Sequence, residues 1–205
     1  MARAIALRRL RTVRHVSDFE TPAPLISNGR LAVLILLGAE AMLFGGFIGA
    51  FLIYKLSAPF WPPPGLPRLP IAVTWANTMV LLGSAMTMKL AVEAAREGRR
   101  FHLRAWLLLT AALGTLFVSV QGSEWTRLEA HGLHLHSGNY GATFYVLIGL
   151  HALHVICAVL WLLGVTVAVV LARPGQDRRA AVEVCAIYWY FVCAVWPLLF
   201  GLVYF

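Results

Sequence analysis

The side chain with the clearest capacity for chemistry is an acid in the middle of an apolar run. Glu40 lies about ten residues into the segment 31–54, roughly 15 Å along a helix axis and so near the midplane of a bilayer. An ionisable side chain at that depth costs about 2.5–3.5 kcal/mol on insertion scales. Two interpretations stay open: a protonated Glu40 hydrogen-bonded to a neighbouring helix, or a carboxyl that handles protons or senses lipid headgroups.

Two histidines form a second candidate group. His151 and His154 are three residues apart, so they share one face of a helix. Such a pair could hold a metal, or one of them a haem, but a haem between helices usually needs a second histidine, and no other apolar segment has one in its interior. We therefore expect no metal or haem in this chain. We expect hydrogen bonds from these histidines to another helix, for example to Glu40, or to a lipid phosphate.

Other polar residues lie near the ends of apolar segments. Gln121 and Glu124 are consistent with a polar cluster at the membrane interface, and Glu183 lies in the first turn of its segment, where a carboxylate favours the helix dipole. The sequence HGLHLH clusters three more histidines, which is one signature of metal binding. We prefer an exposed loop without metal for these three: His131, His134 and His136.

Several catalytic signatures are absent from the sequence. It has no Walker loop, no haem-attachment CxxCH, no HExxH and no convincing nucleophile–base pair. We expect no catalytic residue in this chain, which reads as a membrane subunit without its own redox centre. A small transporter is the competing class, but transporters tend to have broken helices or inverted repeats, and Pro197 is the exception in otherwise proline-poor helix interiors.

The composition places these residues in lipid. Of 205 residues, 60% are hydrophobic and 13% charged, and mean hydropathy is +0.76. An ordinary soluble domain is about half apolar and a quarter charged. Residues 27–205 are therefore predicted to form one all-α integral membrane bundle. Five segments have the length of roughly 20 residues that a spanning helix needs: 31–54, 73–95, 104–125, 141–172 and 181–204.

The first of these segments also carries a ridge of small residues. Ala41, Gly45 and Gly49 lie largely on the face away from Glu40. Small residues four apart let membrane helices approach closely. We expect this ridge to pack against a neighbouring helix.

Basic residues indicate the orientation. If five segments alternate across the membrane, all of the 17 Lys and Arg residues except Lys55, Arg68 and Arg127 fall on one side. The positive-inside rule then puts the N-terminus in the cytoplasm and the C-terminus outside. The net charge of +8 is thus a topology signal, and we expect no nucleic-acid partner. We interpret residues 1–26 as a basic cytoplasmic tail, in preference to an organelle transit peptide.

Five motifs together resemble one known family. GAEAMLFGGFIGAF, ANTMVLLGSAMTM, LGTLFVSVQGSEW, YGATFYVLIGLHALHV and VEVCAIYWYFVCAVW occur in that order. They resemble subunit III of the haem–copper cytochrome oxidases, in the short form with five helices instead of seven. The resemblance covers residues 27–205. The last motif departs from the family pattern, with Tyr190 where His is usual and Cys193 where Asp is usual.

The resemblance implies a non-redox accessory subunit of a complex that oxidises cytochrome c or quinol, reduces oxygen and pumps protons. It implies that haem and copper are in partner subunits, that subunits I and II are the partners, and that this chain binds phospholipid, stabilises subunit I and supports its proton uptake. Related five-helix chains resemble accessory proteins of nitric oxide reductase systems, so that alternative stays open. The implied location is a bacterial plasma membrane, in preference to the mitochondrial inner membrane.

Residue roles follow from the same resemblance. Glu40 corresponds to the membrane-buried carboxyl of the family. The resemblance implies lipid or interhelix contacts for five other residues: His151, His154, Gln121, Glu124 and Glu183.

Overall fold

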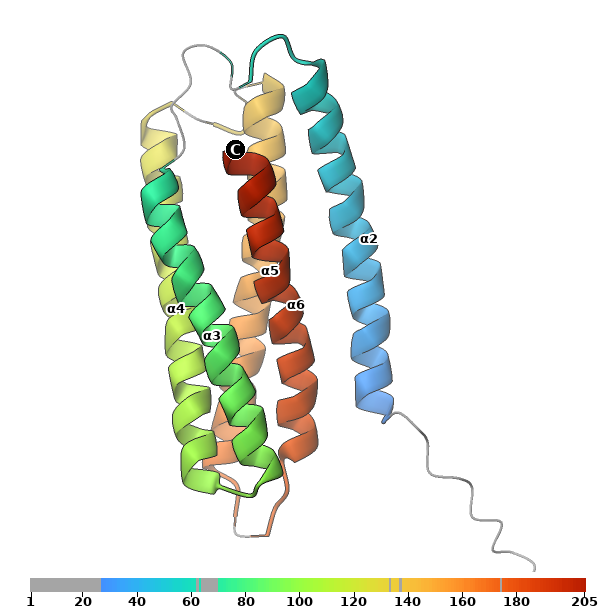
Figure 1. Cartoon of the computed structure of the whole chain (residues 1–205), viewed down its shortest axis with the longest axis vertical. Helices are drawn as coiled ribbons and strands as arrows, with labels where there is room; N and C mark the ends of the chain where they lie inside the picture. Colours follow the sequence, from blue (N-terminus) through green and yellow to red (C-terminus); the bar gives the residue numbers. More distant parts are fainter. Residues whose placement is uncertain (1–26, 62, 64–69, 133, 137, 174) are drawn as a thin grey trace, which may run out of the picture.

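The computed structural model describes residues 27–61, 63, 70–132, 134–136, 138–173 and 175–205, so the tail 1–26 lies outside the described residues. These residues form a bundle of long helices without a strand in the described part (Figure 1). Each helix is long and apolar enough to cross a membrane, which confirms the predicted all-α membrane fold. The five helices are α2 (Asn28–Ser57), α3 (Ile71–Arg96), α4 (Arg100–Ala130), α5 (Gly138–Val170) and α6 (Arg179–Tyr204).

Caps and glycines account for several helix ends. Ser27 is the N-cap of α2, and its hydroxyl accepts a hydrogen bond from the Arg30 backbone N–H. Gly98 adopts φ +70° between α3 and α4, a conformation that favours glycine. The sequence placed the end of the fourth helix at 172, but α5 ends at Val170. It also ended the third helix at 125, whereas α4 continues to Ala130, because amphipathic residues at a helix end carry no hydropathy signal.

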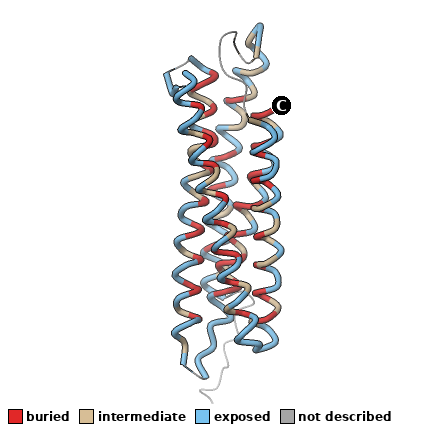
Figure 2. Tube along the Cα trace, turned by 90° about the vertical axis from the view of Figure 1, so that its left-hand side faces the viewer, coloured by how far each residue is buried: buried red, intermediate tan, exposed pale blue. Residues whose placement is uncertain are grey.

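Helix α2 lies at one side of the bundle (Figure 1). Among the described helices it contacts α5 and α6 but neither α3 nor α4. Only four of its 30 residues are buried: Val33, Glu40, Phe44 and Phe51. In the other helices the buried residues follow the inward faces (Figure 2), with Trp189 and Trp196 of α6 among the largest. The core therefore lies between α3, α4, α5 and α6, and α2 covers one edge of it.

The small-residue ridge of α2 does not pack as predicted. A Cβ atom built on Gly45 or Gly49 meets nothing within 4 Å, and Ala41 is exposed. Instead α2 turns its Glu40 face toward α5 and α6. Satisfying a buried carboxyl outweighs close packing of small residues, because an unpaired polar group in an apolar setting costs several kcal/mol.

Candidate functional site

The central polar site joins three helices at Glu40. His154 of α5 places its Nε2 3.6 Å from Glu40 Oε1, and the Tyr188 hydroxyl of α6 donates a hydrogen bond to the same oxygen at 3.2 Å. Glu40 is buried, with 8% of its surface exposed. The predicted contact between Glu40 and a histidine of another helix is thus present. We call these three residues the Glu40 site.

His154 is oriented by its own helix. Its Nδ1 lies 2.6 Å from the Leu150 carbonyl oxygen, which can only accept, so Nδ1 carries a hydrogen. Its Nε2 faces the Glu40 carboxyl at 3.6 Å. The site therefore places an imidazole of α5 beside a carboxyl of α2.

The second carboxyl oxygen of Glu40 lies in an aromatic setting. Glu40 Oε2 is buried and has no hydrogen-bond partner among the described residues. The Phe44 ring lies one helical turn further along α2 and packs on His154, with 5.1 Å between ring centroids. The Glu40 carboxyl is therefore only partly compensated by hydrogen bonds within the described residues.

His151 does not behave as the sequence predicted. Its ring stacks on Trp196 with 5.1 Å between centroids, and neither ring nitrogen has a hydrogen-bond partner in the part of the chain that the structure describes. It lines a mainly apolar cavity of about 150 Å³ between α4, α5 and α6. The interhelix hydrogen bond expected of His151 is therefore absent within the described residues, and its expected contact with lipid stays a prediction.

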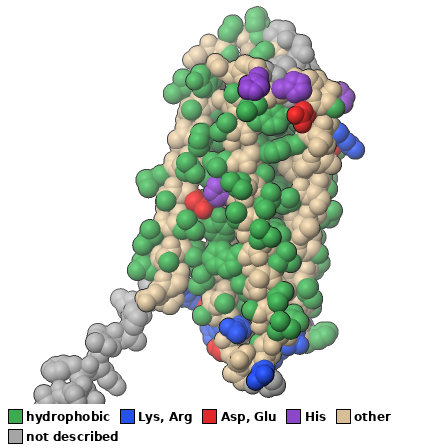
Figure 3. Space-filling model, turned by 180° about the vertical axis from the view of Figure 1, so that it is seen from behind, with side chains coloured by type: hydrophobic (Ala, Val, Ile, Leu, Met, Phe, Trp, Pro, Cys, Tyr) green, Lys and Arg blue, Asp and Glu red, His purple; other side chains and the backbone are tan. Residues whose placement is uncertain are grey.

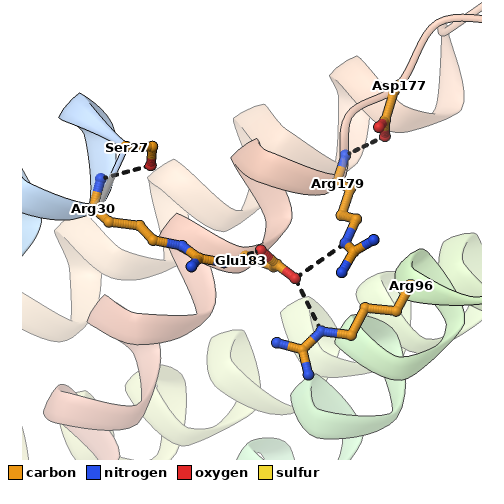
Figure 4. A network of polar contacts seen from close by, with 6 residues as sticks. All are labelled: Ser27, Arg30, Arg96, Asp177, Arg179 and Glu183. Carbon is orange, nitrogen blue, oxygen red and sulfur yellow. Dashed lines mark hydrogen bonds and ion pairs between the residues drawn. The ribbon is translucent and has the colours of Figure 1, made fainter. Parts of the chain in front are cut away.

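Glu183 forms a second polar centre where α6 begins (Figure 4). Its Oε1 accepts hydrogen bonds from Arg96 Nε of α3 at 2.9 Å and from Arg179 Nε at 3.2 Å. Its Oε2 pairs with Arg30 of α2. The Glu183 side chain is 8% exposed, whereas the three arginines are about half exposed. The interhelix contact expected of Glu183 is present, and it ties α2 and α3 to α6.

Gln121 and Glu124 lie near the other end of the bundle. The Gln121 amide donates a long hydrogen bond of 3.4 Å to the Tyr204 hydroxyl of α6. Glu124 is buried but pairs with Arg127 of its own helix at 2.9 Å. Gln121 thus makes the expected interhelix contact, and Glu124 makes a contact within α4.

The three loop histidines are exposed, as predicted. His131 Nδ1 lies 2.6 Å from the Arg127 carbonyl at the end of α4, so this ring caps a helix. Among the described residues no group of three or more His, Cys, Asp or Glu is placed to hold a metal ion.

Sequence reasoning missed the partners of the buried carboxyls. Tyr188, Arg30 and Arg96 were not singled out, although each donates to Glu40 or Glu183. One signal was available: Tyr188 and Arg30 are polar residues at helix positions that an apolar residue would otherwise fill. The pairings themselves join residues 87 to 153 positions apart, which no local pattern reports.

Comparison with known proteins identifies the family. The family profile described as "Cytochrome c oxidase subunit III" matches residues 19–205. The chain belongs to the cytochrome c oxidase subunit III family. Membership makes it an accessory subunit of a haem–copper oxidase complex, and a membrane protein.

Named relatives span bacteria and a mammal. Cytochrome c oxidase subunit 3 of Synechocystis sp. is 36% identical over 84% of this chain and 73% of the relative. The subunit 3 of Thermostichus vulcanus is 32% identical over 85% of each chain. That of Ovis aries is 32% identical over 88% of this chain and 71% of the relative.

The two departures from the family's last motif have different settings. Tyr190 of α6 is partly exposed, with 36% of its surface accessible. Cys193 is buried, and its Sγ lies 3.8 Å from the Leu81 carbonyl oxygen of α3. A thiol in place of a subunit III carboxylate leaves this position between α3 and α6 uncharged.

Proposed function

We propose that this subunit stabilises subunit I of a proton-pumping cytochrome c oxidase, binds phospholipid and supports proton uptake into subunit I. The haem and copper of that complex reside in partner subunits, with subunits I and II as the partners. The single observation that carries the proposal is the Glu40 site, a buried carboxyl of α2 beside an imidazole of α5 and a phenol of α6 within the spanning helices. Groups of that kind in a membrane are expensive and are kept for function.

The surface of α2 supports the lipid part of the proposal. Most large apolar residues of this helix are exposed in the chain alone, including Leu31, Ile35, Met42 and Leu56. Hydrophobic side chains are also spread over the middle of the molecule in Figure 3, whereas basic ones gather at one end. Lipid tails or a partner subunit satisfy such a surface.

Bacterial plasma membrane is the proposed location. The chain covers 85% of its Thermostichus vulcanus relative and 86% of a probable subunit 3 from Nocardia farcinica, but 71% of the sheep relative. Its length is therefore closer to that of these two bacterial subunits, although the Synechocystis relative, covered to 73%, is of the longer kind.

The Glu40→Gln variant tests the proposed role of the carboxyl. Glutamine keeps the size of the side chain, and its carbonyl oxygen can still accept from Tyr188, while the ionisable carboxyl is lost. We expect normal assembly and normal initial oxygen consumption in the purified complex. We expect inactivation during turnover to be about two- to tenfold faster, which corresponds to about 0.4–1.4 kcal/mol in the barrier.

A matched control separates this effect from general loss of charge. Glu93 is a half-exposed carboxylate on α3, 4.0 Å from Lys89, and lies outside the Glu40 site. Glu93→Gln should inactivate at the wild-type rate. Equal inactivation rates for wild type, Glu40→Gln and Glu93→Gln would remove the proton-handling role and leave Glu40 as a structural hydrogen-bond acceptor.

A further inference from the structure

A cavity of about 310 Å³ lies at the end of the bundle where α3 and α5 end and α4 and α6 begin. None of its lining residues belongs to α2, so it is separate from the Glu40 site. Its floor includes the buried apolar side chains of Leu103 and Val169. Five arginines line it, against one carboxylate, Asp177: Arg96, Arg100, Arg104, Arg178 and Arg179.

Three of these five arginines have no carboxylate partner among the described residues. Glu183 accepts hydrogen bonds from Arg96 and Arg179. Asp177 Oδ1 accepts from the backbone N–H of Arg179 at 2.8 Å. Within the described residues no ion pair involves the remaining three, which are Arg100, Arg104 and Arg178.

Backbone carbonyls hold two of the guanidinium groups in place. Arg104 Nη2 donates to the Val170 carbonyl at 3.1 Å, and Arg100 Nη1 donates to the Arg173 carbonyl at 3.4 Å. Carbonyl oxygens fix the position of a guanidinium without cancelling its charge. These two guanidinium groups are therefore positioned in advance, and each has further N–H donors.

The helix termini add to the positive potential. At α4 the N-cap Arg99 makes no side-chain capping hydrogen bond, whereas at α6 the Asp177 carboxylate already accepts from the Arg179 backbone N–H. The N-terminus of a helix carries about half a positive charge and backbone N–H groups that suit a bound anion. Both N-termini lie at this cavity, which Arg100 and Arg179 line as the first residues of their helices.

We propose that this cavity binds a phosphate group, either the headgroup of an anionic phospholipid or a free phosphate. Planar guanidinium groups match phosphate oxygens in pairs, which explains why arginine fills these positions. The apolar floor and the position at the ends of spanning helices suit a lipid headgroup with its glycerol. This site is independent of the proposed function of the Glu40 site.

Binding to the purified, delipidated full chain in detergent tests the proposal. Calorimetric titration uses three probes: dioctanoyl phosphatidylglycerol, dioctanoyl phosphatidylcholine and inorganic phosphate. We expect phosphatidylglycerol to bind more tightly than phosphatidylcholine, whose choline cation faces the arginines. If inorganic phosphate binds as well and displaces phosphatidylglycerol, the phosphate alone suffices; if it does not bind, the lipid is the ligand.

Variants show whether the cavity is responsible. The double variant Arg100→Gln/Arg104→Gln should weaken binding at least about tenfold. Arg104→Lys keeps the charge but loses the planar fork, so an intermediate loss is expected. Arg99→Gln is the matched control, because Arg99 pairs with Glu97 and does not line the cavity, and it should bind as wild type.

Three results would overturn the proposal. One is that neither anionic probe binds the wild-type chain, which would leave the arginines to an acidic protein partner or to topology alone. Another is that the double variant, shown to be folded by circular dichroism, binds as tightly as wild type. The third is that phosphatidylcholine binds as tightly as phosphatidylglycerol, since the charge of the arginines would then contribute nothing.

Discussion

Single polar side chains hold this bundle together at positions where lipid would otherwise be the solvent. Glu183 is the clearest structural example: one carboxylate receives arginines from α2, α3 and α6. Glu40 has fewer partners: the Tyr188 phenol donates to it, and the His154 imidazole lies 3.6 Å away. Glu183 is thus a fully compensated charge that stabilises helix contacts, whereas Glu40 is only partly compensated.

Glu183→Gln should destabilise the protein. The variant removes the charge that three guanidinium groups share, and leaves the donors on three helices facing a neutral amide. The arginines are about half exposed, so solvent screens part of the loss, and we expect the free energy of unfolding to fall by about 1–3 kcal/mol. Thermal unfolding in detergent, followed by tryptophan fluorescence, measures the change.

Glu97→Gln serves as the control for this measurement. Glu97 pairs with Arg99 two residues away, and both side chains are about half exposed. Its loss should leave the midpoint within the error of the wild type. A Glu183→Gln midpoint equal to that of Glu97→Gln would mean that the arginine network contributes nothing to stability.

Helix packing depends on a few close contacts as well as on apolar area. Gly114 of α4 is one such contact: a Cβ atom built there would lie 2.4 Å from Trp189 Cη2 of α6. The Trp189 indole also donates a hydrogen bond to Ser84 of α3 at 3.2 Å, so its ring is held from a second helix and has little room to move. The Trp189 ring therefore leaves room only for a glycine at position 114. Among the described residues no glycine of α2 makes such a close contact, and Gly29 has an ordinary one of 3.6 Å with Val184.

Gly114→Ala should lower stability through this contact. The added methyl group overlaps a buried ring, and overpacking of this kind costs about 1–3 kcal/mol. Gly122→Ala, on the same helix, adds a methyl group where nothing lies within 4 Å and should be neutral or slightly stabilising. Unfolding midpoints of the two variants give the test, and equal midpoints would show that Trp189 moves aside at little cost.

The whole molecule has a strong asymmetry of charge between its two ends. Most described basic residues lie near the start of α2, the α3–α4 connection and the α5–α6 connection, and few lie at the opposite end (Figure 3). The orientation expected from the positive-inside rule follows from this asymmetry. The arginine-lined cavity lies at the same basic end of the molecule. A membrane end rich in fixed cations attracts anionic headgroups as well as setting topology.

Topology follows from this asymmetry as a whole-molecule prediction. Alkaline phosphatase, which is active only outside the cytoplasm, should be active when fused after Ser57 or Phe205 and inactive when fused after Gln176. Ser57 ends α2, and Gln176 lies in the α5–α6 connection. The reverse pattern of activities would place the N-terminus outside, and would contradict the reading of the basic residues.

Sequence alone determined that the chain spans a membrane five times, which polar residues lie within the spans, and which family it belongs to. Hydropathy and length decide these points because each spanning helix must satisfy its own backbone in lipid. Only the tertiary structure decided that His154 and not His151 meets Glu40. It also decided that Arg30 and Arg96 share Glu183. Nor could the sequence show that the glycine ridge of α2 packs on nothing among the described residues. These outcomes depend on how far each helix rotates about its axis and which neighbour it contacts. Packing summed over all helices sets that rotation, and no short stretch of sequence contains it.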